Sequence, residues 1–368
     1  MTRSALWLTL VVALGGGRAA ADDAGKKLSE LAGELKQFLD AKKQKAITLG
    51  TLTGPDPTMN GGPGLTERLK AELVKLNVDV QSTGTTYKIK GEYKRAKPDA
   101  EAGKTTAIKV VLSLRDEDDE EVTKIVREIF DEQAIVEALG LNIELPPTPT
   151  KSAPNRERDL AIEQAIKAKP PIKEGRAQSS ANGLFEMEIL VGKEKEKRPV
   201  KEEEGQARVQ LAKDEEYSVC VYNNHPKLEM AVTLTIDGIN VFAFSDEKGK
   251  DDRPKYSVYI LRPKQQFEIP GWHRTKKEVN RFKVSGYAES AVAKLAKQGD
   301  SSQFGVITAT FSAAWEGKNV PEDEPDRMSE ELFTTQGSKA GFDTEEVSRI
   351  IGSVRGAVSV RYSKSKGK

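Results

Sequence analysis

The second half of the sequence is a series of short segments rich in β-branched and aromatic residues. LFEMEILV, YSVCVYN, AVTLTIDG and YSVYILR are examples, and turn-forming residues separate such segments about every eight to twelve positions. This pattern is typical of an all-β sandwich or barrel with mostly antiparallel strands. We therefore predict an immunoglobulin-like β-sandwich domain over residues 184–315, with one helix inserted at YAESAVAKLA.

The first part of the chain alternates helical and extended segments. Apolar residues recur at helical spacing in two stretches, which contain Leu28, Leu31, Leu35, Phe38 and Leu39, and then Leu65, Leu69, Leu73 and Leu76. KAITLGTLTG, NVDVQ, TTYKIKGEY and TAIKVVLSL read as strands, whereas VTKIVREIF fits either a strand or a helix. DEQAIVEALG predicts a short helix that ends at Gly140. We therefore predict a mixed α/β (α+β) domain over residues 26–146.

Composition changes between and after these two domains. Residues 147–183 are rich in Pro, Ser and charged residues, which predicts a linker with room for one short helix at RDLAIEQAIKA. Residues 316–345 are polar and without periodicity, so we expect a mobile loop there. Residues 346–363 predict a terminal hairpin that joins the sandwich.

The first 21 residues have the layout of a cleaved secretory signal. Arg3 precedes the apolar run Ala5–Leu14, and small residues lead to Ala21, after which we expect cleavage. The apolar run is shorter than the ~20 residues that a membrane-spanning helix needs. We therefore expect a periplasmic or secreted protein without a transmembrane span in the mature chain.

The charge balance and the single cysteine exclude some classes of protein. The 58 basic and 57 acidic residues give a formal charge of +1, which argues against a nucleic-acid-binding protein. Cys220 is the only cysteine, so the chain forms no internal disulfide. Cys220 lies in a predicted strand, where we expect a small buried side chain rather than a reactive thiol.

The segment GPDPTMNGGPGLTERL resembles a phosphate-binding loop before a helix. A nucleotide P-loop needs a lysine after its last glycine, and here Leu65 and Thr66 follow instead. Pro63 also removes one backbone N–H donor. We therefore interpret the segment as a loop that contacts a partner, with Asn60, Gly61 and Gly62 as candidate binding residues.

Metal and cofactor sites are not indicated. The acidic run 116–121 lacks the glycine and the spacing of a calcium loop, which favours a hairpin turn. A zinc site would require Cys220, His225 and His273 to converge, because the chain has only two histidines. We predict no cofactor, no metal and no catalytic residue.

EIPGWHRT contains the most distinctive group of candidate binding residues. Trp272, His273 and Arg274 follow a Pro-Gly turn, so we expect part of the group to reach solvent. An aromatic ring beside a cation and an imidazole can stack on a sugar or bind a carboxylate. In the structural alternative, Trp272 covers the end of the sandwich and Arg274 pairs with a nearby acid.

The first domain resembles a group of bacterial envelope lipoproteins. The group comprises the curli-secretion channel lipoproteins, the flagellar assembly lipoprotein and the outer-membrane activators of penicillin-binding proteins. The resemblance lies in the order of a Leu-spaced helix, ITLGTLTG, a variable loop, GLTERLKAELVKL, YKIKGEYKRA and AIKVVLSLRDEDDEEV. It implies non-catalytic contact with protein partners in the envelope. The chain lacks the lipid-bearing cysteine and the membrane-hairpin strands of these proteins, so the resemblance supports neither lipid anchoring nor a pore.

Together these features predict an exported, non-enzymatic protein that binds envelope proteins or peptidoglycan, with oligomer formation left open. A hydrolase acting on envelope polymers is the alternative, and a cleft with His273 about 3 Å from a Ser or a carboxylate would favour it. A carbohydrate-binding sandwich is a third alternative, which requires exposed, coplanar aromatic residues on one sheet face.

Overall fold

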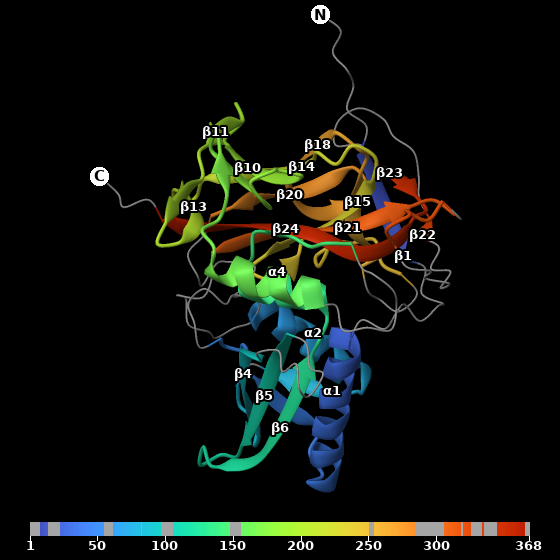
Figure 1. Cartoon of the computed structure of the whole chain (residues 1–368). Helices are drawn as coiled ribbons and strands as arrows, with labels where there is room; N and C mark the ends of the chain where they lie inside the picture. The colour runs from blue at the N-terminus through green and yellow to red at the C-terminus, as the bar shows by residue number, and fades with distance from the viewer. Residues whose placement is uncertain are drawn as a thin grey trace, which may run out of the picture.

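The computed structural model describes residues 8–13, 23–54, 62–81, 83–96, 106–147, 156–249, 254–284, 305–317, 319–324, 333–334 and 344–364. Within these ranges the protein is mostly β, its sheets are mainly antiparallel, and the helices all lie before residue 168. Figure 1 shows the helix-containing N-terminal region (residues 23–167) below the β-rich C-terminal region (residues 172–364). The helix α4 (Arg156–Lys167) lies between them.

The N-terminal region packs helices against one face of a five-stranded mixed sheet. Its other helices are α1 (Asp23–Ala41), α2 (Gly62–Lys75) and α3 (Glu132–Leu139). The sheet order is β3-β2-β4-β5-β6, formed by Asp79–Gln81, Ala46–Leu49, Lys88–Ala96, Ala107–Arg115 and Glu121–Ile129. The expected order of helices and strands is confirmed, and VTKIVREIF proves to be the strand β6.

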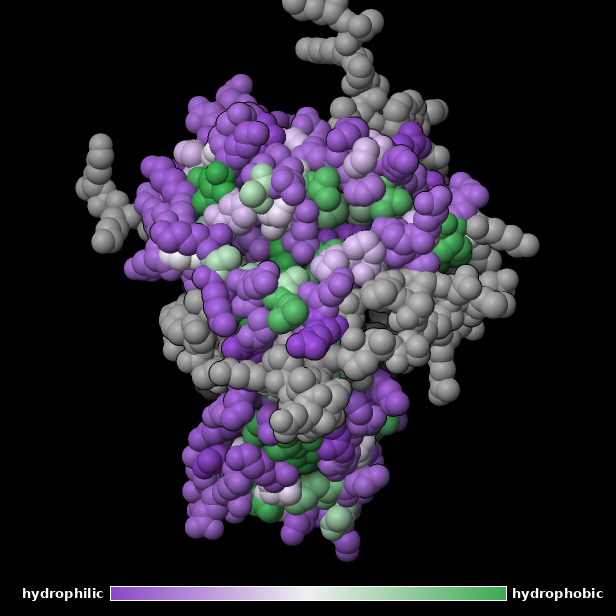
Figure 2. Space-filling model, in the orientation of Figure 1, coloured by the Kyte–Doolittle hydropathy of each residue, from purple (hydrophilic) through white to green (hydrophobic). Residues whose placement is uncertain are grey.

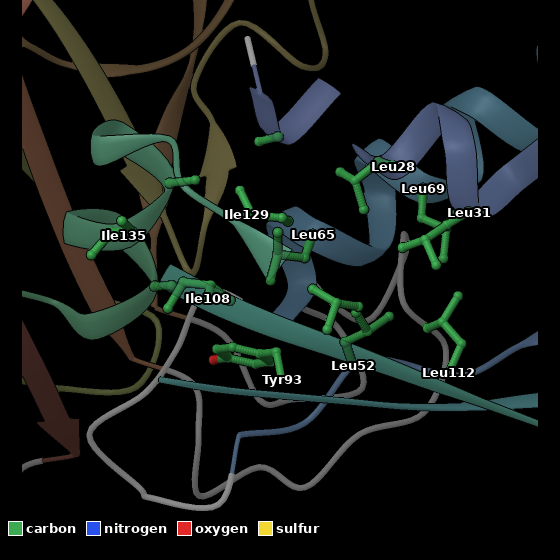
Figure 3. Packing of buried hydrophobic residues seen from close by; sticks show 14 of the residues in the cluster. Leu28, Leu31, Leu52, Leu65, Leu69, Tyr93, Ile108, Leu112, Ile129 and Ile135 are labelled. Atoms are coloured by element: carbon green, nitrogen blue, oxygen red, sulfur yellow. The ribbon is translucent and has the colours of Figure 1, made fainter. Parts of the chain in front are cut away.

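The leucine stripes of α1 and α2 fill the core of this region. Leu28, Leu31 and Leu69 are fully buried and lie against strand residues such as Leu112 and Ile129, as Figure 3 shows. Leu76 differs from the expectation, because it follows the end of α2 and is 36% exposed. The chain turns there, with the next residue in the left-handed conformation.

The C-terminal region consists of two sheets that enclose one core. Among the described residues, the larger sheet has the order β12-β13-β24-β21-β15-β17-β1-β22, with β7, β16 and β23 pairing at its sides. These strands are Lys201–Glu203, Gln206–Leu211, Ile350–Lys364, Val306–Trp315, Glu229–Ile236, Tyr256–Leu261, Leu8–Ala13, Phe333–Thr334, Ile143–Glu144, Ile239–Asn240 and Thr344–Val347.

The second sheet has the order β19-β20-β14-β10-β9-β8, with β11 and β18 pairing at its sides. Its strands are Gly271–Thr275, Glu278–Lys283, Glu216–Asn223, Phe185–Val191, Arg176–Gln178, Ile172–Lys173, Glu196–Arg198 and Gln265–Ile269. Alternation along each strand directs one face inward, so Phe185, Met187 and Ile189 of β10 join the shared core. The predicted mostly antiparallel β domain is thus present in outline.

The two regions share the strand β24. Val358 and Val360 face the core between the two sheets, whereas Val354 and Ala357 belong to the core of the N-terminal region. Arg158 of α4 reinforces this junction with a side chain that is 1% exposed. Its guanidinium donates to both carboxylate oxygens of Glu132, at 2.6 and 2.7 Å, and to the carbonyls of Pro146 and Val354, at 2.5 and 2.6 Å.

Several segments differ from the expectations. The short helix predicted at RDLAIEQAIKA is confirmed as α4, but the predicted linker 147–183 also contains β8 and β9, and β9 pairs with β10. Ile162 and Ala177 of this segment are buried in the two cores. The predicted terminal hairpin is instead one 15-residue strand, β24, preceded by β23. The inserted helix at YAESAVAKLA lies outside the described residues, as does most of the predicted loop 316–345.

The apolar run of the predicted signal contains the strand β1. It pairs with β17 in an antiparallel register in which Leu10 faces Tyr259 and Val11 faces Val258. A strand conformation does not test cleavage after Ala21, which stays a prediction. Within the described residues, no helix combines the length and apolar character needed to cross a membrane.

Candidate functional site

A groove of about 440 Å³ lies where the two regions meet. Four segments form its walls: residues 139–142 after α3, residues 165–170 at the end of α4, the β12–β13 turn at residues 204–207, and Ser359 and Arg361 of β24. Binding sites commonly occur in concavities of this size between structural units. The groove is therefore the candidate site that the geometry favours.

Local backbone rules place each wall. Gly140 has a φ of 61° and donates to the carbonyls of Glu137 and Val136, which ends α3 and turns the chain toward β7. Glu204 and Gly205 both have positive φ, at 55° and 77°, as a tight hairpin turn between β12 and β13 requires. The Gly205 N–H donates to Glu202 at 2.8 Å, which fixes this turn. The groove walls are thus set by the backbone.

The charges on the walls are mainly positive. Lys167, Lys169 and Arg361 contribute three cations, and Glu204 is the one acid among the lining residues. Glu204 pairs with Arg208 at 2.8 Å, so its charge is compensated from outside the groove. Lys169 pairs with Glu202 at 3.1 Å, whereas Lys167 is exposed and has no ion-pair partner among the described residues. The groove therefore favours an anionic group over a cationic one.

The rest of the lining combines apolar and hydrogen-bonding groups. Leu139, Leu141, Ile166 and Ala207 provide apolar surface. Asn142 donates to the carbonyl of Gln178 at 3.2 Å, which leaves its side-chain oxygen as an acceptor. This combination suits a short ligand that carries both an aliphatic part and a carboxylate.

Trp272, His273 and Arg274 lie in β19, far along the chain from the groove segments, and each has structural partners. The Trp272 ring is half-buried and makes edge contacts with Phe244 and Phe282, at centroid distances of 5.1 and 5.5 Å. Arg274 pairs with Asp246 at 2.7 Å and donates to the carbonyl of Phe244 at 2.9 Å. These contacts match the structural alternative for both residues, and a binding role for them stays a prediction.

His273 is fully buried, whereas Trp272 and Arg274 are partly exposed, which agrees with the expectation that part of the group reaches solvent. The Nδ1 of His273 lies 3.1 Å from Ser245 Oγ, and its Nε2 lies 3.8 Å from a carboxylate oxygen of Glu247. The ring also contacts Phe242 at a centroid distance of 4.9 Å. Burial lowers the pKa of His273 to about 4, so the ring is neutral at pH 7.

The Ser245–His273 pair has the spacing of a nucleophile and a base, but its surroundings differ from those of an active site. Ser245 is 1% exposed and His273 is 0% exposed, so a polymer substrate has no access to either side chain. Ser245 Oγ also accepts the Glu247 N–H at 3.1 Å. The pair therefore fastens the 241–247 segment to β19.

Of the three loop residues predicted to bind, only Gly62 is described. Gly62 begins α2 and packs directly against the backbone of Leu52, which follows β2. A Cβ at this position would lie 1.9 Å from the carbonyl oxygen of Leu52. Thr66 completes this contact, since its hydroxyl accepts from Leu52 N–H at 2.8 Å. Gly62 is thus needed for packing, and Asn60 and Gly61 lie outside the described residues.

The remaining sequence expectations concern cysteine and metal ligands. Cys220 is buried in β14, and burial raises the pKa of its thiol to about 11, as expected for a packed side chain. The acidic run 116–121 forms the β5–β6 turn, where Asp116 accepts the N–H groups of Asp118 and Glu120. Across the described ranges, His, Cys, Asp and Glu side chains form no group of three that could hold a metal ion.

Sequence reasoning missed the groove residues. Lys167 lies at the end of the helix predicted at RDLAIEQAIKA, and Lys169 lies in the Pro- and Lys-rich segment that predicts a linker. The Glu-Gly pair before β13 was a visible turn signal, but nothing in the sequence places it beside α4. Comparisons with family models, with curated proteins and with solved structures find no match.

Proposed function

We propose that this chain is an exported, non-enzymatic binding protein of the cell envelope, and that the junction groove holds a carboxylate-bearing peptide. The groove, with its mainly basic walls and apolar lining, is the observation that carries the proposal. Its volume suits a short peptide segment better than a large protein surface. Peptidoglycan stem peptides have this chemistry, and an acidic segment of an envelope protein is the other source.

Export and the resemblance to envelope lipoproteins remain predictions within this proposal. Both rest on the sequence, through the leader-like residues 1–21 and the order of elements in residues 26–146. They supply the compartment in which stem peptides occur. The groove supplies the binding chemistry, so the two arguments are independent.

The hydrolase alternative has one observation in its favour, the 3.1 Å approach of His273 to Ser245. Burial of both side chains argues against it, because a nucleophile must reach the substrate. The carbohydrate-binding alternative needs an exposed aromatic platform. Among the described residues between 172 and 324, every aromatic side chain is buried or half-buried.

Charge reversal in the groove tests the proposal. We expect the Lys167→Glu/Lys169→Glu double variant to lose at least about tenfold in affinity, because two attractive charges become repulsive. The measurement is co-sedimentation with purified peptidoglycan, run beside a pull-down from envelope extract to detect a protein source. Both lysines are exposed, and the Lys169–Glu202 ion pair that the change breaks lies at the surface, so the fold is expected to tolerate the changes.

The matched control is the Lys193→Glu/Lys213→Glu double variant. These lysines are also exposed and lie in the C-terminal region away from the groove lining. The control makes the same change in net charge, so it should keep wild-type binding. Equal losses in both variants, or no retention of peptidoglycan or protein by the wild type, would contradict the proposal.

A further inference from the structure

The strand β6 forms one edge of the N-terminal sheet. It pairs with β5, with a bulge at Val122, and no described strand pairs with its other edge. This edge of nine residues presents backbone groups that can pair with another strand, and one of them, the Val126 carbonyl, already accepts a hydrogen bond from the Arg127 guanidinium at 2.7 Å. The opposite edge strand, β3, has only three residues and offers a much shorter template.

The outward face of β6 carries an ordered set of side chains. Alternate residues Ile125 and Ile129 are buried under the helices, which leaves Val122, Lys124, Val126 and Glu128 on the open face. Val122 is 40% exposed, Val126 is 37% exposed, and Phe130, which follows the strand, is 38% exposed. Figure 2 shows apolar residues in the lower part of the molecule, where Figure 1 draws β5 and β6.

We propose that β6 pairs antiparallel with β6 of a second copy of this chain, about a two-fold axis at Val126. In this register Val126 faces its own copy, Lys124 faces Glu128, and Val122 faces Phe130. Each pair on the open face is then either apolar with apolar or opposite in charge. The two five-stranded sheets become one continuous sheet, and the two-fold axis closes the assembly.

The charges support this partner and this register. Neither Lys124 nor Glu128 forms an ion pair among the described residues, and Lys109 of β5 lies opposite Glu128 in the register of the two strands. Centring the pairing on Lys124 or on Glu128 would place like charges opposite each other, which is unfavourable. Centring it on Ile125 would place Lys124 against Val126 and Glu128 against Val122. The register at Val126 alone matches every pair on the open face.

The inner face is compatible with the same register. Ile125 would face Arg127 of the second copy, and Thr123 would face Ile129. Arg127 already pairs with Glu34 and Glu30 of α1, the latter at 3.3 Å. Its charge is therefore compensated within one copy. This inference goes beyond the proposed function, because it uses a surface remote from the junction groove.

Sedimentation equilibrium of the full chain tests the pairing through charge reversal. We expect the wild type to dimerise, and Lys124→Glu or Glu128→Lys to weaken the dimer about tenfold, because each change creates two like-charge pairs. The Lys124→Glu/Glu128→Lys double variant restores opposite charges and should restore the dimer. A monomeric wild type at ~100 μM, or a double variant as weak as the single variants, would overturn the proposal.

A disulfide at the axis tests the register itself. Val126→Cys places two cysteines opposite each other, within reach of a cross-strand disulfide, so mild oxidation should give a covalent dimer. Val122→Cys is the matched control, since its partner would be Phe130 and no such disulfide can form. Native Cys220 is buried and does not interfere. Equal cross-linking of both variants would indicate random collision and would contradict this register.

Discussion

The two regions of this protein use their sheets differently. In the C-terminal region, two sheets face each other and enclose a core that contains residues from both. In the N-terminal region, helices cover one sheet face and leave β6 with an exposed outward face. The difference shows where binding surfaces are available: the C-terminal sheets bury their inner faces against each other, while the N-terminal sheet and the junction groove remain accessible.

The regions are nevertheless joined by a shared strand, and the comparison can be tested at that junction. Val354 and Ala357 of β24 complete the N-terminal core, and Arg158 holds α4 against the β24 carbonyl of Val354. Two spectroscopic probes distinguish the regions. The described helices all lie in the N-terminal region and report through circular dichroism, whereas Trp272 and Trp315 report on the C-terminal region through fluorescence.

The largest expected effect comes from Arg158→Ala. This change leaves the partly exposed Glu132 carboxylate and the carbonyls of Pro146 and Val354 without their donor, so we expect a loss of about 3 kcal/mol in the free energy of unfolding. Urea unfolding followed by both probes is the measurement. The wild type should show coincident transitions, and in the variant the helical signal should be lost at lower urea than the tryptophan signal.

The control for this experiment is Arg156→Ala on the same helix. Arg156 is exposed, so its replacement should change the free energy of unfolding by no more than about 0.5 kcal/mol. If Arg158→Ala shifts both probes together and only slightly, the two regions are not joined through this side chain.

A comparable or smaller effect is expected from the pH dependence of His273. Burial lowers its folded-state pKa to about 4, below an unfolded value near ~6.5, so the folded state resists protonation. The stability is therefore full above pH 6.5 and falls as the pH decreases toward 4, by up to about 3 kcal/mol from this group. The measurement is the free energy of unfolding at pH 7 and pH 4.

The His273→Phe variant isolates this contribution. A phenyl ring can keep the contacts with Phe242 and Tyr256 but cannot take up a proton. The wild type should lose more stability than the variant between pH 7 and pH 4, although the variant starts lower because it lacks the Ser245 hydrogen bond. Parallel pH profiles for the two proteins would show that His273 becomes protonated without cost and is accessible to water.

Much of the fold could be predicted because local patterns determine it. The leucine spacing of α1 and the alternation in β14 each fix a buried face, and Gly140 fixes the end of α3. The position of each element relative to segments distant in sequence is harder to predict. The sequence predicts the helix α4 but not its position at the junction, because Arg158 is held there by polar groups distant in sequence, Glu132 and the Val354 carbonyl.

In the candidate site, too, residue types can be recognised from the sequence, whereas their spatial arrangement cannot. Trp272, His273 and Arg274 are conspicuous as residue types. In the structure, however, Trp272 packs against the C-terminal core and Phe244, and Arg274 pairs with Asp246. The groove residues are ordinary in type, and only the packing of α4 beside the β12–β13 turn brings them together. A single sequence holds no signal for that juxtaposition, because it depends on contacts between segments about 40 positions apart.

Hydrogen exchange of the full chain, with and without soluble peptidoglycan fragments that carry stem peptides, tests the central claim most directly. The account predicts slower exchange in residues 139–142, 165–170 and 204–207, the backbone segments that line the groove. Slower exchange confined to residues 241–247 and 271–275, or no change at saturating fragment, would contradict it.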